Sequence, residues 1–220
     1  MKITVFKYGQ SFFAEHNFFA DRKGSEKGLP ISFLFYLIET GNRRILIDTG
    51  CNGMEGWDIS HFCSPALLLR KYGLSPLDIT DVIITHPHYD HVACAGYFKN
   101  AAFLMHINTY AEVQNFLPVG VNVCRFEEDL FTDENIQLIH IGGHCKGSSV
   151  VLVTRGEEKL LFCGDEVYSE ECFIRNVGSG HPENPDKNKV FIEKYRGDEY
   201  KKIVFHTPEI LPDQNGFIEI

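Results

Sequence analysis

The chain has 220 residues, of which 44% are hydrophobic, so it is long enough to bury a sizeable core within one large domain. Its formal net charge is -9 at pH 7 and its basic residues are scattered, which argues against nucleic acid as a partner. No stretch approaches the roughly 20 apolar residues that span a membrane, and no signal-peptide-like run opens the chain.

Cysteine usage gives a further indication of the compartment. Seven cysteines occur without a close Cys-x-x-Cys pair, a pattern typical of reduced thiols rather than of a disulfide framework. No repeat, low-complexity tract or linker divides the chain. We therefore expect a single cytoplasmic domain over residues 1–220, with no membrane partner.

The first quarter of the chain favours strands. Residues 3–6 predict a short strand, and residues 11–30, rich first in Phe and then in Gly and charge, predict a long surface loop. Residues 31–40 and 43–50 are β-rich runs separated by a Gly-Asn dipeptide, which favours a hairpin turn between two paired strands.

Helices and strands alternate in the middle of the chain. Ser64 as a cap, Pro65 at the first helical position and Gly73 as a terminator predict one helix. The elements predicted next are a buried strand at 80–85, a short helix at 90–98, a strand at 101–106 and a helix at 108–116 capped by Asn108.

The second half returns to strands. The predicted elements are strands at 136–141, 149–155 and 159–165, a Gly- and Pro-rich loop at 176–186, a helix at about 186–196 and a last strand at 201–207. Strands at both ends with helices between them predict an α/β (α+β) fold in which two sheets pack together with helices outside.

The run "THPHYDH" places four potential metal ligands directly after a buried strand. His86 and His88 are two residues apart on an extended segment, so both side chains point to one side and can bind one cation. Asp90 and His91 begin a helix, and the turn of the chain lets this pair face a second cation. The pattern predicts a metal centre.

Three further candidates follow strands in the second half of the chain. His144 stands on a Gly-flanked turn, Asp165 follows the strand at 159–165, and His206 follows the last strand. Strand ends that open into loops are the usual place for sites built on a rigid scaffold.

These motifs, in this order, resemble the metallo-β-lactamase superfamily of metal-dependent hydrolases. The resemblance rests on "LIDTG" with Asp48, on "THPHYDH", "GHCKGSS" and "CGDE", and on the terminal histidine, and it covers nearly the whole chain. It implies an αββα sandwich of two mixed β-sheets with helices on the outer faces, and a centre of two divalent metal ions.

The resemblance also implies how the ligands are shared. One metal is assigned to His86, His88 and His144, the other to Asp90, His91 and His206, with Asp165 bridging them beside a water or hydroxide. Two cations that share a water lower its pKa enough to give hydroxide at neutral pH. We expect zinc, although imidazole and carboxylate ligands also suit manganese, iron or cobalt. Asp48 is expected to orient a ligand histidine.

Within the superfamily the chain is most similar to the N-acyl homoserine lactonases, in which a tyrosine three residues after the bridging aspartate assists the substrate carbonyl or leaving oxygen. Tyr168 has that spacing from Asp165. The chain departs from these enzymes at Thr207, usually Asp, and at Cys145 and Lys146, usually Thr-Pro, and Lys146 places a cation near the site. These departures bear on the substrate.

The mechanism that the resemblance implies is ring opening of a small-molecule lactone or related ester. Metal-bridging hydroxide attacks the carbonyl, Tyr168 donates a hydrogen bond to the oxyanion, and Asp90 passes a proton to the leaving alkoxide. An apolar wall for an acyl chain is expected from six aromatic residues: Phe12, Phe13, Phe18, Phe19, Trp57 and Phe62.

Three questions stay open at the level of sequence. The same centre serves a thioesterase of the glyoxalase II type or a phosphodiesterase, and a metal-binding protein without turnover is a third alternative. The metal ion is not fixed by the ligand types alone. The sequence is compatible with a monomer or a homodimer.

Overall fold

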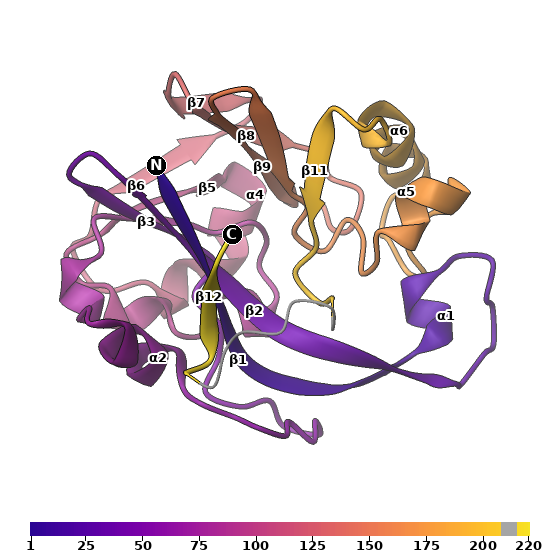
Figure 1. Cartoon of the computed structure of the whole chain (residues 1–220), viewed down its shortest axis with the longest axis horizontal. Coiled ribbons are helices and arrows are strands. Elements are labelled where there is room, and N and C mark those ends of the chain that lie inside the picture. Colours follow the sequence, from indigo (N-terminus) through magenta and orange to yellow (C-terminus); the bar gives the residue numbers. More distant parts are fainter. Residues whose placement is uncertain (208–214) are drawn as a thin grey trace. The chain divides into compact units, whose positions relative to one another are not determined.

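In the computed structural model, which describes residues 1–207 and 215–220, the chain divides into two units. The first comprises Met1–Ser11, Ser32–Arg125 and the described residues at the end of the chain, and the second comprises Phe12–Ile31 and Phe126–Thr207. Each unit is built around one β-sheet (Figure 1).

The sheet of the first unit has the strand order β12-β1-β2-β3-β4-β5-β6 over the described residues. The bounds of these strands are β1 Lys2–Ala14, β2 Gly28–Thr40, β3 Arg43–Ile47, β4 Asp81–Ile83, β5 Ala102–His106, β6 Val123–Phe126 and β12 Phe217–Glu219. Strands β3, β4 and β5 run parallel, whereas β2 pairs antiparallel with β3 and β12 with β1. The sheet is therefore mixed.

The sheet of the second unit has the described order β11-β10-β9-β8-β7. The bounds of its strands are β7 Leu130–Asp133, β8 Ile136–His140, β9 Ser149–Arg155, β10 Glu158–Phe162 and β11 Tyr200–Ile203. Because β9 is antiparallel to both β8 and β10, and β10 is parallel to β11, three strands share one direction. The carboxyl ends of β8, β10 and β11 consequently lie at one edge of the sheet.

Six α-helices are described. Their bounds are α1 Glu15–Phe18, α2 Pro65–Tyr72, α3 Tyr89–Val92, α4 Ile107–Val113, α5 Glu171–Arg175 and α6 Pro185–Tyr195. Within the described ranges the longest, α6, has 11 residues, about half of the roughly 20 needed to cross a bilayer, and no helix qualifies as a membrane span.

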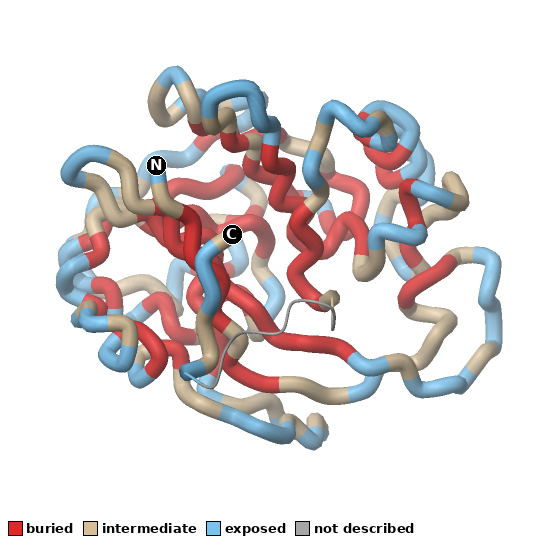
Figure 2. Tube along the Cα trace, in the orientation of Figure 1, coloured by how far each residue is buried: buried red, intermediate tan, exposed pale blue. Residues whose placement is uncertain are grey.

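Buried apolar residues follow the strands. Strand β2 is buried continuously from Ile31 to Ile38, as the unbroken buried stretch along it in Figure 2 shows. In α6 the buried apolar residues are Phe191, Ile192 and Tyr195, spaced as one face of a helix. All seven cysteines are free thiols, as their spacing predicted.

Most predicted elements are confirmed, with two instructive errors. Residues 11–30 are a loop only in part: β1 continues to Ala14, α1 follows, and β2 begins at Gly28, so that residues 19–27 alone lie outside helices and strands at the tip of a hairpin. Helix α4 is not capped by Asn108, since His106 holds the N-cap position and its ring accepts the Asn108 N–H at 3.2 Å. The hairpin turn between β2 and β3 is confirmed.

The helix predicted after Ser64 is also confirmed, with a difference at its start. Pro65 occupies the first turn and Gly73 ends the helix in the left-handed conformation, with φ 98°. Ser64 holds the N-cap position, but its hydroxyl makes no capping hydrogen bond. The proline and the glycine therefore set the limits of this helix.

Candidate metal centre

Three polar residues of the first unit follow two neighbouring parallel strands. Asp48 comes directly after β3, and Thr85 and His86 follow β4, so all three leave the sheet at the same edge. The backbone N–H of Asp48 donates to the Ile83 carbonyl at 2.8 Å. Asp48 has the left-handed φ of 61°, which turns its side chain away from the course of the strand.

The carboxylate of Asp48 is fully buried and accepts three hydrogen bonds. Its donors are the Thr85 N–H and the Thr85 hydroxyl, each at 2.8 Å, and the His91 Nδ1 at 2.7 Å. Burial raises the pKa of Asp48, whereas His91 and Thr85 act in the opposite direction. The expected role of Asp48 in orienting a histidine agrees with these contacts.

These hydrogen bonds set the tautomers of two histidines. His91 donates from Nδ1 to Asp48, so its Nε2 carries the lone pair. Thr85 gives its own proton to Asp48, so its oxygen accepts from His86 Nδ1 at 3.0 Å, and His86 likewise presents Nε2. The two ring centroids are 4.0 Å apart. The donor set fits a divalent cation, since imidazole nitrogens held by a carboxylate are typical metal ligands.

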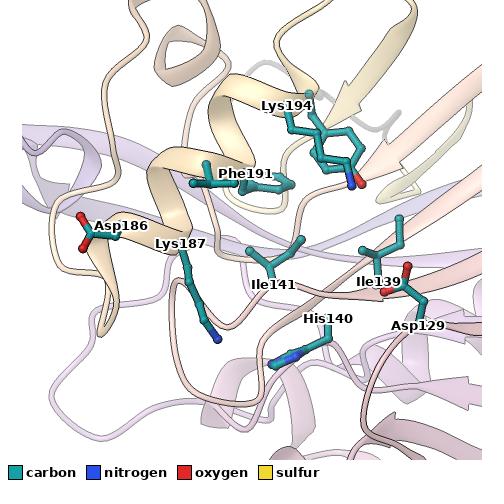
Figure 3. A pocket seen from close by; sticks show the side chains of 10 residues that line it. Asp129, Ile139, His140, Ile141, Asp186, Lys187, Phe191 and Lys194 are labelled. Carbon is teal, nitrogen blue, oxygen red and sulfur yellow. The ribbon is translucent and has the colours of Figure 1, made fainter.

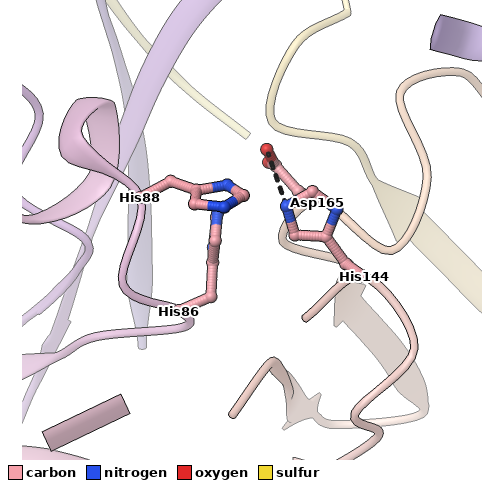
Figure 4. Close-up of side chains that lie close together, drawn as sticks. All are labelled: His86, His88, His144 and Asp165. Carbon is pink, nitrogen blue, oxygen red and sulfur yellow. Dashed lines mark ion pairs between the residues drawn. The ribbon is translucent and has the colours of Figure 1, made fainter. Parts of the chain in front are cut away.

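His88 and Asp90 complete the motif of the first unit. His86 and His88, labelled in Figure 4, lie on the loop after β4. Their ring centroids are 4.7 Å apart and their planes are at 80°. Asp90 places Oδ2 3.5 Å from the His91 Nε2. The four predicted ligands of "THPHYDH" are thus neighbours within one unit.

A tyrosine of β1 holds the start of α3 in place. The hydroxyl of Tyr8 donates to the backbone carbonyl of Asp90 at 2.8 Å. Burial, with a smaller contribution from the Asp90 charge, raises the pKa of Tyr8 well above its ordinary value. The phenol therefore stays protonated and remains a donor at neutral pH.

The three ligand candidates of the second unit meet at the shared edge of its sheet. His144 follows β8, Asp165 follows β10 and His206 follows β11. Asp165 Oδ1 lies 3.2 Å from His206 Nε2, and Oδ2 lies 3.8 Å from His144 Nε2, the ion pair dashed in Figure 4. One oxygen of the carboxylate faces each histidine.

The next residue, Glu166, is a second buried carboxylate. It accepts the backbone N–H of Gly143 at 3.1 Å, that of His144 at 3.0 Å and the Ser148 hydroxyl at 2.5 Å. The amide of Asn188, in α6, donates to the same carboxylate at 3.1 Å. Burial raises the pKa of Glu166, although all these donors oppose that rise.

Tyr168 lies beside His144 and His206, the two histidine ligand candidates of the second unit. Its ring centroid is 5.5 Å from that of His206 and 6.1 Å from that of His144. Phe13 and Phe18, from the hairpin tip, contact the same ring at 5.7 and 5.9 Å. The three aromatic rings form a continuous apolar surface next to the ligand candidates.

The hairpin tip is part of the second unit, and main-chain hydrogen bonds as well as the Arg175–Asp21 ion pair hold it against the rest of that unit. The N–H of Ala20 donates to the Gly178 carbonyl, and the N–H of Gly180 donates to the Asn17 carbonyl, both at 2.9 Å. The Cys172 thiol lies 3.6 Å from the Phe18 carbonyl. Backbone pairing therefore helps to fix the position of Phe13 and Phe18.

The other predicted aromatic residues have different surroundings. Phe19 is buried under the Arg175 guanidinium at 4.7 Å, and Trp57 packs edge-on against Phe33 at 6.0 Å. Phe12 and Phe62 are exposed, as is Lys146. Of the predicted wall, Phe13 and Phe18 are the members in contact with Tyr168.

The second unit also contains a groove of about 490 Å³ between α6 and the end of β8 (Figure 3). Its floor is apolar, with Ile139, Ile141 and Phe191, and its rim carries two lysines and two aspartates. None of the seven predicted metal ligands lines it. The groove is thus separate from the candidate centre.

Sequence reasoning missed four residues that support the ligands: Tyr8, Thr85, Glu166 and Asn188. Two of them are marked in the sequence by their position, because Thr85 directly precedes His86 and Glu166 directly follows Asp165. Tyr8 and Asn188 are not marked in this way, because β1 and α6 are distant in sequence from the motifs they contact.

The class of protein follows from a comparison with sequence families. Residues 34–207 match the profile of the Metallo-beta-lactamase superfamily, which spans most of the chain, and the chain belongs to this superfamily. Among curated proteins, the N-acyl homoserine lactonase AiiB of Agrobacterium fabrum is 31% identical over 107 residues. The match covers 42% of this chain but only 38% of AiiB.

Solved structures confirm the predicted fold class. An N-acyl homoserine lactone hydrolase, with the product N-hexanoyl-L-homoserine at its catalytic metal centre, gives a TM-score of 0.79 at 20% identity over 93% of this chain and 92% of that chain. The dizinc quorum-quenching lactonase AidC, in complex with a product, gives 0.75 at 18% identity over 99% and 93%. These likenesses establish the metallo-β-lactamase fold of two mixed sheets with helices.

Proposed function

We propose that this protein is a metal-dependent hydrolase whose two groups of ligands together hold two divalent cations. The seven proposed ligands are His86, His88, Asp90, His91, His144, Asp165 and His206. Membership of the superfamily supports this set. The observation that carries the proposal is Asp165, whose two oxygens face His144 and His206 separately.

In the proposed reaction the cations activate water, whereas the side chains stabilise charge and transfer a proton. Two bound divalent cations lower the pKa of a shared water and polarise a carbonyl oxygen. Tyr168 donates a hydrogen bond to the oxygen that becomes negative as the carbonyl carbon turns tetrahedral. Asp90 takes up a proton and delivers it to the departing alkoxide. Phe13 and Phe18 shield Tyr168 from water on one side.

The substrate that we propose is a lactone of the N-acyl homoserine type, or a related ester. AiiB and the two structural neighbours are described as lactonases or lactone hydrolases of this type, which supports a lactone here. The aromatic surface of Phe13, Phe18 and Tyr168 suits an acyl chain. We propose zinc as the ion because the fold is similar to that of a dizinc enzyme. We also propose a single catalytic domain that works in the cytoplasm, where its seven free thiols would stay reduced.

The proposal is tested by a hydrolase panel run on protein of measured metal content. We expect about two equivalents of zinc and turnover of lactones that depends on acyl-chain length, both lost after treatment with a chelator and restored by added zinc. Thioesters and phosphodiesters belong in the same panel as alternatives. Metal-replete protein that turned over one of those and opened no lactone would refute the proposed substrate.

The Tyr168→Phe variant tests the part of the tyrosine. Loss of the hydroxyl should lower kcat for the best lactone about 10- to 100-fold, because one hydrogen bond to a developing oxyanion contributes roughly 1.5–3 kcal/mol. KM and zinc content should stay near the parent values, since the ring remains. Tyr200→Phe, in β11 of the same unit, is the matched control. An unchanged kcat would remove Tyr168 from the mechanism.

A further inference from the structure

The loop that carries His144 is fastened by a buried carboxylate that is not itself one of the proposed ligands. Glu166 accepts two consecutive backbone N–H groups, those of Gly143 and His144, as well as the Ser148 hydroxyl at the other end of the loop. Its side chain is almost fully buried, with 1% exposure. The loop is thus closed around a single acceptor group.

Glu166 is in turn held by α6. The Asn188 amide donates to the Glu166 backbone carbonyl at 2.6 Å and to its carboxylate at 3.1 Å, and its own oxygen accepts the Ser179 N–H at 3.1 Å. Asn188 is fully buried. A buried polar side chain destabilises a protein unless it makes hydrogen bonds. The three hydrogen bonds of the Asn188 side chain are all made within the second unit.

The local geometry requires glycine at the point of closest approach. A Cβ atom added to Gly143 would collide with the Glu166 carboxylate and would lie 2.9 Å from the backbone of Asn188. The "GGHCKGSS" loop and the "DEVY" segment are therefore matched to each other at Gly143 and Glu166. This match explains the second glycine of the loop.

We infer that Glu166 is the positioning residue for His144, with Asn188 fixing Glu166, and that this pair sets the affinity of one of the two cations. The inference rests on the proposed function in one respect, that His144 is a ligand. Glu166 does not touch the substrate. It acts through the backbone of the His144 loop, in the way that groups behind a metal ligand tune affinity, typically 10- to 100-fold.

The test is Glu166→Gln, which keeps the size of the side chain. The amide NH₂ must face donors, either the His144 and Asn188 N–H groups or the Gly143 N–H and the Ser148 hydroxyl, so at least one bond to the loop is lost. With Co²⁺ as the probe, we expect the parent to bind two equivalents and the variant to bind one of them about 10- to 100-fold more weakly, with a changed visible absorption band.

A second measurement needs no metal. In metal-free protein, the amide hydrogens of Gly143 and His144 should exchange faster with solvent in Glu166→Gln than in the parent, while those of β9 should not change. The matched control is Glu183→Gln, because Glu183 is exposed and accepts the Lys146 N–H of the same loop at 2.9 Å. This control should match the parent in both measurements.

Equal Co²⁺ affinities and equal exchange in parent and variant would overturn the inference. If Glu166→Gln does not fold, Ser148→Ala is the alternative variant, because it removes one donor and leaves the carboxylate in place. Co²⁺ binding at the same site that is weaker by at least about threefold would support the role of Glu166. Co²⁺ binding does not depend on turnover, so a parent that binds two ions and opens no lactone contradicts the proposed substrate alone.

Discussion

Replacing Asp165 with alanine is expected to lower kcat/KM by about 1,000-fold or more and to leave fewer than two bound cations. The carboxylate has one oxygen toward His144 and the other toward His206, so its removal takes a ligand from both proposed cations. A metal ion contributes several kcal/mol of transition-state stabilisation, and each 1.36 kcal/mol is a factor of ten. Metal analysis and steady-state kinetics on one preparation measure both effects.

Asp165→Asn gives the graded version of the same experiment. The amide keeps the shape of the side chain and one oxygen, but its NH₂ group cannot coordinate a cation. We therefore expect one tightly bound cation and an activity between those of the parent and Asp165→Ala. Asp186→Asn, at an exposed position in the same unit, is the control for loss of charge. An Asp165→Ala protein with two ions and parental kinetics would exclude a bridging role.

The second large effect is expected for Asp48→Asn. Asparagine tolerates the left-handed φ of 61° as aspartate does, so the exchange changes hydrogen bonding rather than the backbone. Both carboxylate oxygens accept hydrogen bonds, and an amide NH₂ in either place opposes a donor of Thr85 or His91. If His91 reverses its tautomer, the proton moves to Nε2, the atom needed for coordination.

The expected result is a metal affinity about 10- to 100-fold lower and metal-free protein less stable by about 1–3 kcal/mol, the cost of one unsatisfied buried group. Denaturant unfolding and zinc titration measure the two quantities. Asp58→Asn, exposed in the same unit, is the control. Thr85→Val should lower the affinity for the cation proposed at His86 more than the affinity for the cation proposed at His91, because the threonine hydroxyl contacts the ring of His86 alone of the two. Parental zinc affinity in Asp48→Asn would contradict this account.

The ligand residues could be predicted because their chemistry is written in short stretches of sequence. His86, His88, Asp90 and His91 lie within one loop and one helical turn, so their proximity needs no knowledge of the fold. His144, Asp165 and His206 were predictable as strand ends. That they belong together depends on β8, β10 and β11 sharing a direction, which periodicity does not reveal.

The supporting residues were harder to predict for a physical reason. Asn188 looks like an ordinary polar residue of an amphipathic helix, and only the docking of α6 shows that it is buried. The glycines and charges of the hairpin tip predict a loop over its whole length, since in local composition they outweigh its Phe residues. Strand pairing between β1 and β2 overrides that local composition.

The attachment of the hairpin tip has a consequence for how the protein can change over generations. The main-chain bonds that help to hold the tip involve the N–H and carbonyl groups of Asn17, Ala20, Gly178 and Gly180, which almost any sequence supplies, although Gly180 itself leaves no room for a side chain beside His16. Tip side chains that make no such contact can therefore vary while the tip keeps its place, whereas Asp21, which pairs with Arg175, cannot. The half-buried Phe13 is such a position, so the proposed preference for an acyl chain can change there while the main-chain bonds persist.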